Sequence, residues 1–113
     1  MEFNAYQLHA RETAIYPNID KNWQYTLWGL GGEVGELINK GKKVIRDDQG
    51  ILSETRKIEM RDELGDILWY VAMAACELGV TLNDVAMQNL EKLAKRRHTG
   101  TISGSGDKRQ DSL

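Results

Sequence analysis

Four acidic residues, set in two pairs, are the side chains of this sequence best suited to chemistry. Glu33 and Glu36 lie three residues apart in the segment GEVGEL, and Glu63 and Asp66 have the same spacing in DELGDILWY. On a helix, this spacing places both side chains of a pair on one face, where their like charges disfavour the helix by roughly 0.2–0.5 kcal/mol per pair. A Mg²⁺ ion removes this repulsion, since it prefers oxygen ligands and is usually shared between carboxylates and substrate phosphates. The pairs therefore predict a magnesium site that binds phosphates.

Two long helices must position these acids. A single proline, and β-branched residues without strict alternation, favour an all-α fold. One helix is predicted over about 22–45, with Glu33 at the edge of its apolar stripe and Glu36 just beyond that edge. The next should begin after Ser53 as N-cap and run to residue 78, with Glu63 and Asp66 along its rim. Packing the two stripes in matching register brings the acidic rims together.

Shorter helices are predicted on either side of this pair. Asn4 can cap a helix over about 5–15, and Thr81 can cap another over about 82–97, with Asp84 completing a capping box. The glycine-rich stretch 29–35 costs helix stability, which indicates close approach to the backbone or a kink. Residues 99–113 are rich in Gly and Ser and predict an extended arm or disordered tail. The helical domain should thus span residues 1–98.

Composition excludes several classes of protein. A chain of 113 residues forms one domain, and its net charge of −2 gives no electrostatic case for binding nucleic acid or an anionic membrane. No apolar run approaches the ~18–20 residues of a membrane-spanning helix. The single Cys76 cannot form an internal disulfide, which suits a reducing compartment. We therefore expect a cytoplasmic protein with neither a nucleic-acid nor a membrane partner.

The acid pairs resemble the motifs of MazG-type nucleoside triphosphate pyrophosphohydrolases, usually written EExxE followed by ExxD. Glu33, Glu36, Glu63 and Asp66 match this pattern, whereas Gly32 stands at its first acidic position. That departure leaves the number of metal ions open. Further segments resemble a branch of small MazG-like proteins over nearly the whole chain: YQ at 6–7, TAIYP at 13–17, GLGGEVGEL, ELGDILWY, NLEKLAKR from Asn89, and the closing GDKR.

The resemblance implies an all-α bundle of four to five helices, packed across subunits in a homo-oligomer, either a dimer or a tetramer. It also implies hydrolysis of a ribo- or deoxyribonucleoside triphosphate at the α–β phosphate bond, giving the monophosphate and pyrophosphate. Glu33, Glu36, Glu63 and Asp66 would be the catalytic residues and would hold Mg²⁺, with Mn²⁺ as a substitute. One carboxylate should also act as base, and Glu33, on the inner rim, is preferred among the four.

Other side chains have the chemistry to bind the remainder of such a substrate. Amino and guanidinium groups clamp phosphates, amides contact a sugar or base, and aromatic rings stack on a base. In that order, the candidates are Lys40, Lys92 and Arg96, then Asn89, then Trp28 and Tyr70. The cations equally suit solvated helix ends. Trp28, Trp69 and Met73 are expected outside the main apolar stripes, which indicates surface for a subunit contact.

Three other interpretations stay open at this stage. Gly32 favours a catalytically silent module that keeps the fold for assembly or regulation. A relative that prefers deoxyuridine or deoxycytidine nucleotides would share the chemistry and differ in its base pocket. A DNA-binding helical protein is least favoured, because the chain is acidic and shows no basic recognition helix. Base and sugar preference and the physiological role are not encoded in any residue that we can name.

Overall fold

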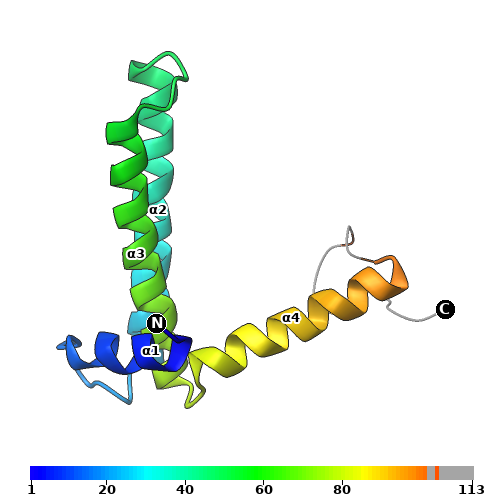
Figure 1. Ribbon diagram of the computed structural model, residues 1–113. Helices are drawn as coiled ribbons and strands as arrows, with labels where there is room; N and C mark the ends of the chain where they lie inside the picture. Colours follow the sequence, from blue (N-terminus) through cyan, green and yellow to red (C-terminus); the bar gives the residue numbers. More distant parts are fainter. Residues whose placement is uncertain (102–103, 105–113) are drawn as a thin grey trace.

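Four helices make up the part of the chain that the computed structural model describes, residues 1–101 and 104. They are α1 (Phe3–Glu12), α2 (Trp23–Asp47), α3 (Glu54–Glu77) and α4 (Leu82–Thr99). α2 and α3 form a long antiparallel hairpin, α1 lies across its base, and α4 projects away from it (Figure 1). The described residues contain no strand, so the predicted all-α class is confirmed. Most of the predicted arm, residues 102–103 and 105–113, lies outside them.

Three of the four predicted helix starts are accurate to a residue. Ser53 Oγ accepts a hydrogen bond from the Arg56 N–H at 3.2 Å, and Thr81 Oγ1 accepts one from the Asp84 N–H at 3.0 Å. The predicted cap at Asn4 is wrong, because α1 begins at Phe3. Asn4 Oδ1 instead accepts the Asn83 N–H at 3.0 Å, which joins α1 to the start of α4. A local cap is thus replaced by a contact between helices.

The connection between α1 and α2 is hydrogen-bonded to one carboxylate at the end of α3. Glu77 accepts hydrogen bonds from the Tyr16 hydroxyl at 2.7 Å, from the Asp20 N–H at 2.6 Å and from the Asn22 N–H. Tyr16 is buried and stacks on Tyr25, with ring centroids 5.0 Å apart. A single side chain therefore fixes where α2 begins relative to α3.

These hydrogen bonds make stability depend on the ionisation of Glu77. Burial alone would raise its pKa, but the bonds from Tyr16, Asn22 and Asp20 outweigh burial and hold the pKa below the usual 4.5. A lowered folded-state pKa stabilises the fold above the unfolded pKa, and that stability is lost as pH falls through the folded value. We expect Glu77→Gln to lower the free energy of unfolding by about 1–3 kcal/mol at pH 7 in urea denaturation. The deficit should shrink below about pH 4.

Glu54→Gln is the matched control, since the Glu54 side chain is 85% exposed at the other end of the same helix. It should change stability by less than about 0.5 kcal/mol. An equal deficit for Glu77→Gln at pH 7 and at pH 3 would show that ionisation of Glu77 does not matter.

The core gathers where α1, the connection and the start of α4 cover the C-terminal half of α3. Its buried members are Ala10, Tyr16, Ala72, Met73, Ala75 and Leu82. Met73 is fully buried, so its expected exposure is wrong. Trp69 is half-buried, and its indole N–H donates to Thr13 Oγ1 at 2.8 Å. Met73 belongs to the same buried cluster as Ala10 of α1, and Trp69 contacts Thr13 directly after α1.

Much apolar surface stays uncovered elsewhere along the hairpin and α4. α2 buries only Thr26 and Val44, whereas Trp28 is 76% and Ile38 63% exposed. On α4, Leu90 is 60% exposed. The radius of gyration is 17.2 Å, against about 13 Å for a compact domain of this length. Among residues 1–101 and 104, no further layer covers these apolar side chains.

Among the described residues, no single helix is long and apolar enough to cross a membrane. α3 and α4 meet the length and composition criteria only as a pair, and they are bent by 100° at the break between them.

Candidate active site

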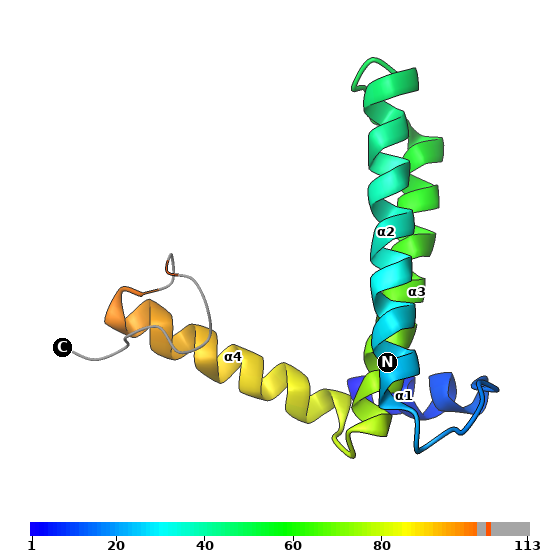
Figure 2. The ribbon, with the colours of Figure 1, turned by 180° about the vertical axis from the view of Figure 1, so that it is seen from behind.

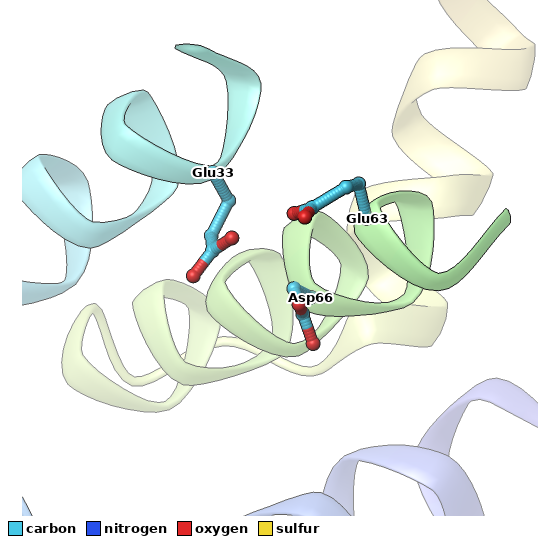
Figure 3. Close-up of side chains that lie close together, drawn as sticks. All are labelled: Glu33, Glu63 and Asp66. Atoms are coloured by element: carbon cyan, nitrogen blue, oxygen red, sulfur yellow. The ribbon is translucent and has the colours of Figure 1, made fainter. Parts of the chain in front are cut away.

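Three of the four predicted acids converge between α2 and α3. Glu33 projects from α2 towards Glu63 and Asp66 of α3 (Figure 3). One carboxylate oxygen of each lies within 4.8 Å of the others. The two helices thus pack in the register that brings their acidic rims together. Glu36, one turn further along α2, is exposed and stands outside this group.

Negative charge dominates the cluster. Burial, a hydrogen bond with Glu63 and the charges of Asp66, Glu63 and Glu36 raise the pKa of Glu33. The buried Oε2 of Glu63 has no hydrogen-bond partner among the described residues. Orphaned buried oxygens are rare in proteins, so this atom marks a place where a ligand belongs.

A divalent cation would balance the negative charge of these three carboxylates. All the atoms that face one another are carboxylate oxygens, which hard cations such as Mg²⁺ prefer. An ion held by Glu33, Glu63 and Asp66 would give Glu63 Oε2 a partner and remove the repulsion among the acids. The residues present therefore suit the predicted cofactor.

Lys40 lies beside the cluster. A residue that binds the phosphates of a substrate held there would need this position. The Nζ of Lys40 is 3.6 Å from Glu63 Oε1, and both side chains are mostly covered, at 24% and 15% exposure. Lys40 lies seven residues after Glu33, close to two helical turns, so both project from a similar face of α2. A cation here can contact a phosphate that enters the acidic cluster.

Tyr70 also borders the cluster, but its ring packs on the α2 backbone. Burial and the neighbouring Tyr25 and Glu33 raise the Tyr70 pKa. Three of its ring atoms lie 2.0–2.6 Å from where a Cβ of Gly29 would stand. The ring also meets Trp69 edge to face at 84°. Gly29 thus confirms the expected close approach to the glycine-rich stretch, with a side chain of α3 as the neighbour.

Gly29→Ala is expected to separate α2 from α3, because the new methyl group would overlap the Tyr70 ring. Overpacking of this kind typically destabilises by about 1–3 kcal/mol. Gly31→Ala is the matched control on the same helix, since nothing lies within 4 Å of its Cβ position. It should be neutral or stabilise by about 0.5–1 kcal/mol through helix propensity. Thermal unfolding followed by circular dichroism measures both, and similar melting temperatures would contradict the close packing.

The structure does not bring the predicted residues of α4 to the acids of the same chain. Asn89, Lys92 and Arg96 all lie on α4, which points away from the hairpin in both views (Figure 2). Asn89 and Lys92 line a separate hollow of about 700 Å³, whose described lining residues all fall within 80–95. Arg96 is buried. The cause is the 100° bend after α3, where Gly79 takes a left-handed φ of +71°.

Tyr6 of α1 is a neighbour of the cluster that the sequence did not predict. Burial, followed by the charge of Asp66, raises the Tyr6 pKa. Its segment belongs to the family resemblance, which gives this residue no role. Periodicity within one helix could not reveal the contact, because it depends on how α1 crosses α3.

Residues 22–101 match the family model described as the MazG nucleotide pyrophosphohydrolase domain. The matched region covers α2, α3 and α4 and contains all three converging acids. The chain belongs to the MazG family. Membership implies a hydrolase that acts on nucleotides, and it confirms the resemblance found in the acid motifs.

A relative of this MazG chain is the "Gene 37 protein" of Mycobacterium phage L5. The two are 42% identical over 114 residues, which cover 96% of this chain and 100% of the relative. No solved structure matches the chain. Gly32, where the MazG motif carries its first acid, has nothing within 4 Å of its Cβ position, so packing does not demand a glycine there.

Proposed function

We propose that this MazG chain hydrolyses nucleoside triphosphates, with ribose or deoxyribose, between the α and β phosphates. The products are the nucleoside monophosphate and pyrophosphate. The observation that supports this proposal most is the convergence of Glu33, Glu63 and Asp66, with Lys40 beside them. One buried carboxylate oxygen of Glu63 has no hydrogen-bond partner in the described part of the chain. Such a set can hold a divalent cation and a polyphosphate together.

Mg²⁺, or Mn²⁺ as a substitute, neutralises phosphate charge when bound in such a site. Glu33, Glu63 and Asp66 would hold it, with Glu36 on the next turn as the outermost of the four proposed ligands. Lys40 binds a phosphate oxygen and so orients the triphosphate along the cluster. Glu33 takes a proton from the attacking water. Glu33 is preferred for this role because it faces Glu63 and Asp66 from the other helix.

A panel of ribo- and deoxyribonucleoside triphosphates with Mg²⁺ tests the reaction, with pyrophosphate and orthophosphate read separately. Pyrophosphate with monophosphate is the expected result, and the relative rates rank the bases. Orthophosphate with diphosphate would place the cleavage at the β–γ bond and overturn the proposal.

Gly32 supports the second candidate, a catalytically silent MazG module for assembly or regulation. This candidate predicts no metal-dependent product from any nucleotide in the panel. Because a side chain at position 32 meets open space, Gly32→Glu restores the family's first acid without disturbing the packing of α2 and α3. Turnover that appears only in Gly32→Glu would establish the silent module.

We also propose a cytoplasmic homo-oligomer, a dimer or a tetramer, in which helices of two copies cover one another. The exposed apolar side chains of α2, α3 and α4 and the separation of α4 from the hairpin support it. Leu90→Asp is expected to shift the mass in sedimentation at micromolar concentration towards the monomer. Ile15→Asp, at a position 95% exposed in the α1–α2 connection, should not. A wild-type monomer would contradict the proposal.

A further inference from the structure

Tyr70 of α3 packs directly against the backbone of α2. Its Cε1, Cζ and Cδ1 atoms lie 2.0, 2.4 and 2.6 Å from the position that a Cβ of Gly29 would take. The other glycines of the same stretch, Gly31, Gly32 and Gly35, have nothing within 4 Å of that position. The ring therefore occupies a place that only a glycine leaves open, and it sets the spacing of the two helices at this level.

This contact lies one helical turn from the acids on both helices. Gly29 precedes Glu33 by four residues on α2. Tyr70 follows Asp66 by four residues on α3. Residues four apart are neighbours on one face of a helix, and side chains lean towards the N-terminus, so Glu33 leans back over the turn that holds Gly29. Burial, followed by the charges of Tyr25 and Glu33, raises the Tyr70 pKa, in agreement with this placement.

Trp69 restrains the ring of Tyr70. The two rings meet edge to face, with their centroids 4.9 Å apart. The indole N–H of Trp69 donates a hydrogen bond to Thr13 Oγ1 at 2.8 Å, and that hydroxyl donates to the carbonyl oxygen of Ala10 at 2.7 Å. The end of α1 thus holds the indole, and the indole limits the movement of the Tyr70 ring.

The three converging acids depend on how α2 packs on α3, because they come from different helices. Glu33 belongs to α2, whereas Glu63 and Asp66 belong to α3 (Figure 3). Mg²⁺ demands near-ideal octahedral geometry, with oxygen ligands at about 2.0–2.1 Å. Like charges favour separation of the acids while no ion is bound. A ring packed between the helices one turn away opposes shifts of α2 relative to α3.

We propose that Tyr70 is a positioning residue, whose ring against Gly29 holds the acid of α2 at the distance from the two acids of α3 that a shared divalent cation requires. This inference rests on the proposed function for the identity of the ion. The ring acts on the ion through Glu33 and touches neither the ion nor the substrate. Its hydroxyl has no part in this role, so a phenylalanine should serve equally well.

Titration of the full chain with Mn²⁺, followed by the electron paramagnetic resonance signal of the free ion, measures ion binding without turnover. Mn²⁺ accepts the same oxygen ligands as Mg²⁺. Tyr70→Leu should raise the Kd of Mn²⁺ by about tenfold or more, because residues that orient metal ligands typically contribute 10–100-fold to affinity. Tyr70→Phe should bind Mn²⁺ as the wild type does.

Gly29→Ala provides a second variant, which displaces the ring without removing it. It should raise the Kd of Mn²⁺ in the same direction, whereas Gly31→Ala, with open space at its Cβ position, should not. Circular dichroism checks that each variant is folded.

Val44→Ala is the matched control for a general loss of packing. Val44 is buried on α2, 6% exposed, and lies eleven residues beyond Glu33, about 16 Å along the helix. Its truncation should lower the stability measured by urea denaturation, as Tyr70→Leu does, but leave the Kd of Mn²⁺ unchanged. A purely structural role of Tyr70 predicts instead that both variants weaken Mn²⁺ binding alike.

The inference is overturned if Tyr70→Leu binds Mn²⁺ as tightly as the wild type, or if Val44→Ala weakens binding equally. Weak binding by Tyr70→Phe would also overturn it, since the hydroxyl and not the ring would then be required. Turnover is read separately. A wild type that binds Mn²⁺ with the help of the Tyr70 ring but hydrolyses no nucleotide would refute the proposed function and support the positioning role.

Discussion

Asp66→Asn is expected to lose Mg²⁺-dependent pyrophosphate release while the metal-free chain stays folded and at least as stable as the wild type. Charge stabilisation by a bound metal contributes several kcal/mol to such reactions, so loss of a ligand should lower kcat/KM by about 100-fold or more. Asp66 is exposed, and its charge is one cause of the raised Glu33 pKa. Its neutralisation therefore relieves repulsion and should raise metal-free stability by a few tenths of a kcal/mol, roughly 0.2–0.5.

Thermal unfolding with and without Mg²⁺ gives a readout that does not depend on turnover. A ligand that binds only the folded state stabilises it, so millimolar Mg²⁺ should raise the melting temperature of the wild type and have little effect on Asp66→Asn. Asp62→Asn is the matched control, one turn earlier on α3, where the side chain is 66% exposed and pairs with its neighbour Arg61. If Asp62→Asn and Asp66→Asn lose activity alike, the effect belongs to surface charge and not to the cluster.

Glu33→Gln is expected to lower kcat by about 10²–10⁴ with a change in KM of only a few-fold, because general base catalysis typically contributes that much. The amide keeps the shape and one oxygen of Glu33 but cannot take a proton from water. The same change removes the like-charge repulsion between Glu33 and Glu63, which is one of the causes of the raised Glu33 pKa.

Glu36→Gln separates the role of base from general negative charge. Glu36 is exposed one turn along α2, outside the three acids that converge, so its loss should lower kcat by less than about tenfold. Initial rates over a range of nucleotide concentrations give kcat and KM for both variants. Unchanged kcat in Glu33→Gln would remove this residue from the mechanism, and one of the remaining carboxylates would have to be the base.

Local patterns in the sequence predicted most of the helical framework. Ser53 and Thr81 cap helices because their hydroxyls satisfy backbone N–H groups only three residues away. Glu33 with Glu63 and Asp66 followed from spacing, since helical periodicity fixes which side chains share a face. The prediction that Asn4 caps α1 is wrong, because its side chain bonds outside its own helix. A cap is a local choice, and the N–H of Asn83 on another helix provided the partner for its side chain.

The arrangement of the helices relative to one another could not be read from these patterns. Asn89, Lys92 and Arg96 were grouped with the acids by chemistry, but the bend after α3 directs them away within one chain. Met73 is predicted to be exposed when only the packing of α2 on α3 is considered, but Ala10 of α1 and Tyr16 of the connection also belong to the cluster that buries it. The packing of α1 against α3 also brings Tyr6 within range of the charge of Asp66.

The sequence by itself determined the all-α class, the helix pair, the acids along its rim and the family, because each depends on residues close together in the chain or on a recognisable motif. Only the tertiary structure decided that Glu36 stands apart, that Gly29 makes room for Tyr70 and that one Glu63 oxygen finds no hydrogen-bond partner within the described residues. The physical reason is that burial and charge at a site are sums over neighbours from several helices. Those neighbours are set by crossing angles and register, which the periodicity of a single helix does not contain.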